Sequence, residues 1–173
     1  VYHTSMGGIT KYMLLNSSAA VATASMWGSP TASAFIVGGT GYEVNESGNN
    51  YIAYCWHGVD GFSKFGGYTG NGNENGPYVF TGFKPAYFMS KRFDSTSDWI
   101  IWDNARSKFT PCTERLIASS NGAEGSASID LLSNGIKIRN SDVSRNASGG
   151  TYIYMAFAEH PFIGDGTNPV TAR

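Results

Sequence analysis

Charged residues are scarce in this sequence. Asp, Glu, Lys and Arg make up 14% of its 173 residues, against about a quarter in an ordinary globular domain. The formal net charge is −1, and Lys91–Arg92 is the only pair of adjacent basic residues. A nucleic-acid groove needs a stripe of basic side chains, so we expect no nucleic-acid partner. Weakly charged chains do not repel one another, so the composition favours assembly.

Long hydrophobic runs and cysteine pairs are also missing. No apolar stretch approaches the roughly 20 residues of a membrane span, so no membrane partner is expected. The two cysteines, Cys55 and Cys112, are too few for a disulfide framework. We interpret Cys55 as a small buried residue and place Cys112 in a connection; a bridge between them is the less favoured alternative.

Familiar catalytic motifs are absent as well. The sequence contains no G-x-S-x-G, Walker loop, H-E-x-x-H or C-x-x-C pattern. His3, His57 and His160 lie far apart in the sequence, so no metal cluster and no cofactor are expected. A hydrolase of polysaccharides needs two facing carboxylates, which a sequence alone does not reveal. The available carboxylates are interpreted as turn formers and loop charges: Asp60, Asp94, Asp98, Asp103 and Glu159.

Glycine and aromatic residues, by contrast, are abundant. The chain has 22 glycines, and aromatic residues make up 14% of it. Short aromatic and β-branched runs between Gly, Pro and Asn predict strands with hardly any helix. Pro85 is expected at a bulge or an edge, because it cannot donate to a ladder, and Asn134-Gly135 predicts a hairpin turn. The strands expected in the central segment are Ser63 to Tyr68, Tyr78 to Phe83, Ala86 to Lys91 and Trp99 to Asp103.

One stretch is written twice. GNNYIAYCWHGVDGF (Gly48 to Phe62) corresponds to GGTYIYMAFAEHPF (Gly149 to Phe162). In this alignment Tyr51-Ile52 meets Tyr152-Ile153, and Trp56 meets Phe157. Both faces of each copy are mostly apolar, which is typical of a strand inside a sheet. We therefore predict that both copies are buried central strands.

The similarity extends upstream and sets the predicted architecture. Ordered matches make residues 1–62 and 101–162 two copies of one unit, with chance similarity between β-rich segments as the alternative. The expected fold is all-β: a duplicated β-sandwich-like unit with short strands and Gly/Asn-rich loops. The predicted domains are 1–75, a first repeat unit truncated at its N-terminus, and 76–173, a second repeat unit. Val1 is expected to continue a strand.

Three strings carry a family resemblance: GFSKFGGYTGNGNENGPYVFTGFKPAYFMSKR, NASGGTYIYMAFAEHPF and the closing PVTAR. They resemble a repeat domain of unknown function in tail-fibre and other virion structural proteins of tailed bacteriophages, especially marine ones. The resemblance covers nearly the whole chain. It implies a non-enzymatic component of the virion surface that associates with other virion proteins and binds a host receptor. It also implies a homo-oligomer, with a trimer as the first expectation. It supplies no catalytic or ligand residues.

Two rival functions stay open: a polysaccharide depolymerase, and a purely architectural decoration protein of the phage head or tail. A secreted lectin outside phages is a weaker third. For receptor glycans the candidates are Trp27, expected as an exposed ring in a loop, and Tyr68 with Asn71 and Asn73 beside it. The loop Thr69 to Gly76 is interpreted as a turn in preference to a calcium site, since it has one carboxylate. The other tryptophans are expected in the core: Trp56, Trp99 and Trp102.

Overall fold

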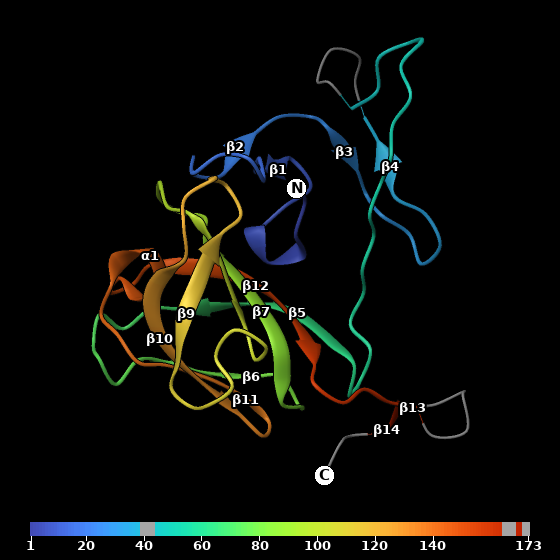
Figure 1. Ribbon diagram of the computed structural model, residues 1–173. Helices are drawn as coiled ribbons and strands as arrows, with labels where there is room; N and C mark the ends of the chain where they lie inside the picture. The colour runs from blue at the N-terminus through green and yellow to red at the C-terminus, as the bar shows by residue number, and fades with distance from the viewer. Residues whose placement is uncertain (39–43, 164–168, 171–173) are drawn as a thin grey trace.

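The computed structural model describes residues 1–38, 44–163 and 169–170 (Figure 1). Its centre is an eight-stranded antiparallel sheet with the strand order β5-β12-β7-β8-β9-β10-β11-β6. The all-β expectation is confirmed. The strands of this sheet are β5 (Ser63–Thr69), β6 (Tyr78–Phe80), β7 (Pro85–Arg92), β8 (Trp99–Asp103), β9 (Cys112–Ile117), β10 (Gly125–Leu132), β11 (Gly135–Ile138) and β12 (Thr151–Ala158).

Local sequence signals place the strands of the central segment correctly. Pro85 begins β7, and the register between β7 and β12 shifts where Ala158 pairs with Pro85. A residue without an N–H is tolerated at such an irregularity, as expected. The turn Ser133-Asn134 joins β10 to β11, with Leu132 opposite Gly135. This is the predicted hairpin.

The main core lies inside the curve of the sheet. The sheet curls so that β9 and β10 pass over β7 and β12 (Figure 1), and β10 contacts β7. Trp102 is fully buried and its indole N–H donates to the carbonyl of Ala127 at 2.9 Å. Phe88 stacks on Tyr154 with ring centroids 5.5 Å apart. Burying each such side chain contributes about 1.5–3 kcal/mol, so this cluster holds the sheet closed.

A second, smaller core joins the N-terminal segment to the outside of the sheet. This segment contains the 3-10 turn η1 (Thr4–Met6), β1 (Lys11–Tyr12) and β2 (Ala22–Thr23). Met6 and Met13 pack against Trp99 and Ile153. The strand expected at Val1 is not formed: Val1 exchanges two hydrogen bonds with Met13, of 2.6 and 3.0 Å.

The remaining elements are short. β3 (Trp27–Gly28) pairs with β4 (Ile36–Val37), and β13 (Phe162–Ile163) pairs with β14 (Pro169–Val170). The hairpin expected around Gly38 to Gly41 falls partly on residues outside the described ranges; within them, β4 pairs with β3. The single α-helical turn among the described residues, α1 (Val143–Asn146), is capped by Asp142.

The predicted duplication is wrong in its central claim. Gly149 to Phe162 contains β12, which lies between β5 and β7 in the middle of the sheet. In the matching stretch, residues 49–58 form neither helix nor strand. A strand needs neighbours to receive its hydrogen bonds, and the strands formed by residues 1–38 are only two residues long. The strand β5, from the first predicted unit, pairs directly with β12 of the second.

Candidate functional site

Tyr68 is engaged in the structure of the sheet. Its ring stacks on Tyr152 with centroids 4.7 Å apart. Its hydroxyl donates to the carbonyl of Arg145 at 3.0 Å. Burial raises the pKa of this hydroxyl well above the usual value. The ring face that sequence analysis offered to a glycan is therefore covered by another ring.

The Asn-rich loop after β5 is organised by its own side chains. The Asn71 carboxamide oxygen accepts from the N–H of Asn73 at 3.0 Å, and the Asn73 oxygen accepts from the N–H of Asn75 at 2.8 Å. Gly72 adopts a φ of 67°, which favours glycine. These are the bonds of a tight turn, as the preferred interpretation of this loop held.

A residue that sequence analysis did not single out, Asn146, holds this loop to the fold. Asn146 is fully buried at the end of α1. Its carboxamide oxygen accepts from the N–H of Asn71 at 2.7 Å. Its amide group donates to the Asn71 side chain and to the carbonyls of Asn73 and Asn140. Asn71 and Asn73 are therefore structural residues that brace a buried amide.

Trp27 lies at the base of the β3–β4 hairpin. It pairs with Val37 and is half-buried, and its ring lies 6.3 Å from that of Tyr2. The indole N–H is buried without a partner among the described residues. The exposed ring expected at Trp27 is therefore half-buried, and only part of it is open to a ligand.

Exposed aromatic surface is found instead in residues 49–58, which we call the arm. The arm runs as a long extended trace from the tip of the β3–β4 region down to β5 (Figure 1). Ile52 is 82% exposed, Tyr54 74% and Trp56 56%, and the rings of Tyr54 and Trp56 stack 6.0 Å apart. Cys55 is exposed too, and Cys112 is buried, both as free thiols. The expected burial of Cys55 and Trp56 is wrong.

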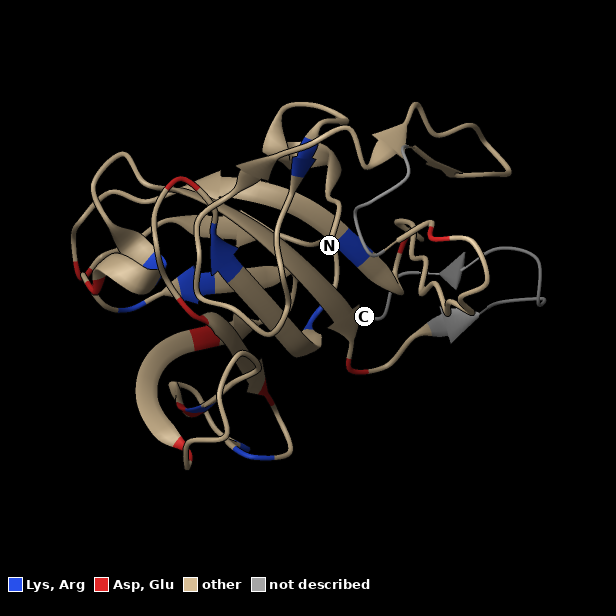
Figure 2. Ribbon diagram, turned by 90° about the horizontal axis from the view of Figure 1, so that it is seen from above, with Lys and Arg blue, Asp and Glu red and all other residues tan. Residues whose placement is uncertain are grey.

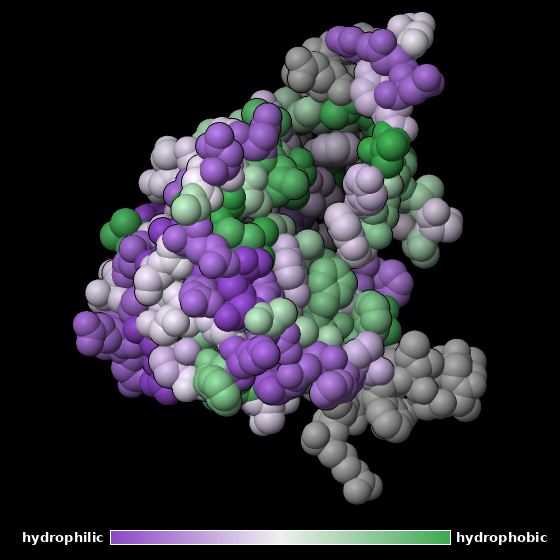
Figure 3. All heavy atoms as spheres, viewed as in Figure 1, coloured by the Kyte–Doolittle hydropathy of each residue, from purple (hydrophilic) through white to green (hydrophobic). Residues whose placement is uncertain are grey.

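Most of the arm's main chain is also unpaired, apart from its two ends, where the N–H of Asn49 donates to Glu46 and the carbonyl of His57 accepts from Ser63. Among the described residues, no hydrogen bond joins the backbone of residues 50–56 to another group. The arm and the segment before it are almost without charge, since only Glu43 and Glu46 carry charge between Lys11 and Asp60. Figure 3 shows hydrophobic residues along this side of the molecule. Elsewhere basic and acidic positions are interspersed (Figure 2).

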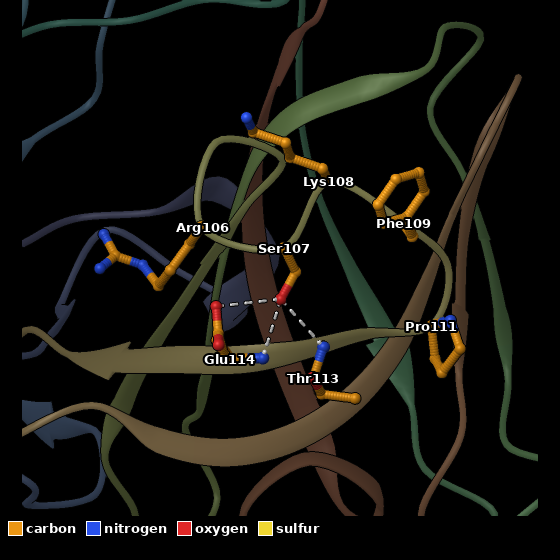
Figure 4. A pocket seen from close by; sticks show the side chains of 7 residues that line it. All are labelled: Arg106, Ser107, Lys108, Phe109, Pro111, Thr113 and Glu114. Carbon is orange, nitrogen blue, oxygen red and sulfur yellow. Dashed lines mark hydrogen bonds between the residues drawn. The ribbon is translucent and has the colours of Figure 1, made fainter.

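A shallow hollow of about 340 Å³ lies in the loop between β8 and β9 (Figure 4). Phe109 stands at its rim and is 84% exposed. Ser107 forms the floor, because its hydroxyl accepts from the backbone N–H groups of Thr113 and Glu114 at 3.2 and 3.1 Å. The hollow offers three kinds of group to a small polar ligand: the apolar ring of Phe109, the cationic Lys108 and the acceptor carboxylate of Glu114. The isolated Phe109 in the polar string SKFTP was the available sequence signal.

Six carboxylates in the described part of the chain are engaged in ion pairs. The hydrogen bond from Arg92 lowers the pKa of Asp94, and the one from Lys84 lowers the pKa of Glu159. A general acid needs a raised pKa, so these groups act as structural anions. The other pairs are Arg106 with Asp103 and Glu124, Arg139 with Asp130, and Arg145 with Asp142.

Within the described ranges, no three His, Cys, Asp or Glu side chains are grouped closely enough to hold a metal ion. None of the helices in the described part of the chain has the length and apolarity that crossing a membrane requires.

Comparison with known proteins places the chain in a family. No curated protein matches it. No solved structure matches it either. A family model described as a domain of unknown function, DUF7483, matches residues 1–161. That match covers most of the 173 residues, so the chain belongs to the DUF7483 family.

Proposed function

We propose that this protein is a non-enzymatic structural module of a tailed-phage virion surface, which assembles with other copies and holds a host glycan. The arm carries the proposal. Soluble monomers rarely expose large contiguous apolar surfaces, and such surfaces mark sites of association. Here aromatic side chains stand on an uncharged segment whose backbone is unpaired as well. The phage resemblance of the sequence gives the setting, with other virion proteins as partners.

The state of the carboxylates supports a role without chemistry. A depolymerase would use one carboxylate as an acid and a second facing the same sugar ring. Asp103 is held by Arg106 at 3.0 Å, and Glu159 is held by Lys84 at 2.7 Å and by the Asn104 amide at 2.8 Å. These contacts leave the two carboxylates as anchors for loops around the sheet.

The hollow at Phe109 is the proposed place for a glycan. Its volume, about 340 Å³, is at the low end for ligand sites, so it suits a single sugar unit. The ring of Phe109 offers a face for the apolar side of a sugar. Lys108 and Glu114 also line the hollow and offer a donor and an acceptor for hydroxyl groups. This hollow replaces Trp27, Tyr68, Asn71 and Asn73 as the first candidate.

The test combines mass and binding. Light scattering of the purified chain should give a closed oligomer, with three times the 18.5 kDa of one chain as the first expectation. A screen against host surface glycans should show binding that is insensitive to salt and releases no product. Phe109→Ala should weaken binding about tenfold, equivalent to about 1.4 kcal/mol. Phe80→Ala, which removes an exposed ring from β6, should not.

Each contrary result has its own meaning. A monomer at every concentration overturns the assembly. Release of shortened polysaccharide overturns the non-enzymatic role in favour of a depolymerase. A stable oligomer that binds no glycan leaves the architectural role and removes the adhesive one.

A further inference from the structure

We infer that the arm of one copy adds as a β-strand to the outer edge of β5 in a second copy. The inference rests on the proposed assembly and names its contact. Unpaired strand edges and unpaired extended segments satisfy each other when they form a ladder, because each supplies the N–H and C=O groups that the other lacks. Within this chain, the arm is the unpaired extended segment and the outer edge of β5 is the unpaired strand edge.

The sequence of the arm identifies its partner. Residues 48–62 resemble residues 149–162, which contain β12. β12 pairs with β5 over its whole length, from Thr151 opposite Thr69 to Phe157 opposite Ser63. Because the arm resembles β12 in sequence, and β12 pairs with β5, the arm is suited to pair with β5 as well. Among the residues that the structure describes, the arm has no such neighbour.

The outer edge of β5 is open over most of its length. β5 ends the eight-stranded sheet, so β12 covers only one of its two edges. On the other edge, within the described residues, the chain's own Val59 bridges Ser63 and the ladder stops there. Residues 64–69 therefore remain for an incoming strand of about six residues.

The β12 register can be transferred to the arm. Ala156 lies opposite Lys64 in the β12–β5 ladder, and Cys55 aligns with Ala156. An arm in this register runs from Asn50 opposite Thr69 to Cys55 opposite Lys64. It ends where the Val59 turn closes the edge. Aromatic side chains then meet across the strands, Tyr51 with Tyr68 and Tyr54 with Phe65, which is a favourable cross-strand pairing.

A second copy suits this contact better than the chain's own β5. The bridge between Val59 and Ser63 fixes a different register for the chain's own arm, with Cys55 opposite Gly67. The arm leaves β5 immediately after that bridge (Figure 1). A net charge of −1 opposes association only weakly.

The available area fits a stable contact. At the exposed fractions of Tyr51, Ile52, Tyr54 and Trp56, the arm leaves on the order of 500 Å² of side-chain surface open. With a similar area covered on the β5 edge, one arm–edge contact buries on the order of 1,000 Å² in total, near the roughly 1,200 Å² of a stable interface. Arm and edge are different surfaces, so the copies join head to tail, and the trimer of the proposed function is a ring of three such contacts.

Disulfide trapping tests the register. Lys64 is exposed and lies opposite Cys55 of the second copy in the inferred ladder, where the Cα separation suits a disulfide. Lys64→Cys should give covalently linked copies under mild oxidation, seen on a non-reducing gel. Cys55→Ser in the same chain should abolish the link. The wild-type chain and Thr69→Cys, five positions along the strand, should link at least tenfold more slowly.

The remaining outcomes separate the two proposals. Gly67→Cys tests pairing within one chain. If this variant forms an intramolecular disulfide with Cys55 and Lys64→Cys gives no linked copies, the arm lies on its own β5 and the inference is overturned. An oligomer without any Lys64→Cys link keeps the assembly and overturns the arm–β5 contact. A chain that stays monomeric and unlinked overturns both.

Discussion

Asn146 illustrates how a buried polar side chain positions a loop far from it in sequence. Its side chain bonds to Asn140, six positions earlier, and to Asn71 and Asn73, which lie 75 and 73 positions earlier. A carboxamide is suited to this, since it both donates and accepts. These bonds fix the conformation of the loop Thr69 to Gly76, whose Asn residues had suggested a calcium or glycan site.

Replacing Asn146 with Ala should cost roughly 3 kcal/mol of unfolding free energy, because the part-buried groups at Asn71, Asn73 and Asn140 lose their partner. Urea denaturation measures this. Asn75→Ala is the matched control, since the Asn75 side chain is exposed and has no hydrogen bond among the described residues. It should change stability by less than about 0.5 kcal/mol. Equal effects of the two substitutions would contradict the role given to Asn146.

Lys91 is a buried cation with a pH signature. Burial lowers its pKa from 10.5 to about 8, and its ammonium donates to the carbonyls of Arg92 and Ser18 at 2.7 and 3.3 Å. Between these two pKa values the unfolded chain holds a proton that the folded chain has released. Stability therefore rises with pH in this window and is lowest below about pH 8.

The expected rise between pH 8 and 9.5 is about 1.5 kcal/mol. It should be absent in Lys91→Met, whose side chain does not titrate. The difference between the two unfolding curves isolates this group from the tyrosines that titrate at higher pH. Parallel curves for the two chains would show that Lys91 keeps an ordinary pKa.

At the scale of elements, two similar segments have opposite environments. Ile153 in β12 is 2% exposed, whereas its counterpart Ile52 in the arm is 82% exposed. Ile153→Ala should cost about 2–4 kcal/mol through the cavity it leaves. Ile52→Ala should cost less than about 0.5 kcal/mol in the dilute monomer. Comparable costs in urea titrations would mean that the arm packs within its own chain.

Sequence patterns predicted β5, β7, β8 and the β10–β11 hairpin, because alternation and turn residues act locally. They failed for the arm, since its apolar residues signal only that it needs neighbours. The sequence cannot say whether the same chain supplies them. The candidate site failed for a related reason. Tyr68 and Asn71 have the right chemistry for a glycan, but their partners Tyr152 and Asn146 lie about 80 residues away.

At the scale of the whole molecule, a curled, well-packed sheet stands beside an arm that has no strand partner among the described residues. The main core lies within the curve of the sheet. The arm contributes nothing to that core and leaves both its backbone and its aromatic side chains open. In the proposed function the two parts have different roles: the sheet is the rigid body that carries the Phe109 hollow, and the arm is the segment that joins copies.

Hydrogen exchange of the arm amides as a function of protein concentration tests this account most directly. The prediction is that amides of residues 50–55 exchange within seconds in the dilute monomer and become protected as the oligomer forms. The outward amides of β5 should become protected over the same concentration range. Arm amides that exchange within seconds in a fully oligomeric sample would contradict the claim that the arm is an intermolecular strand.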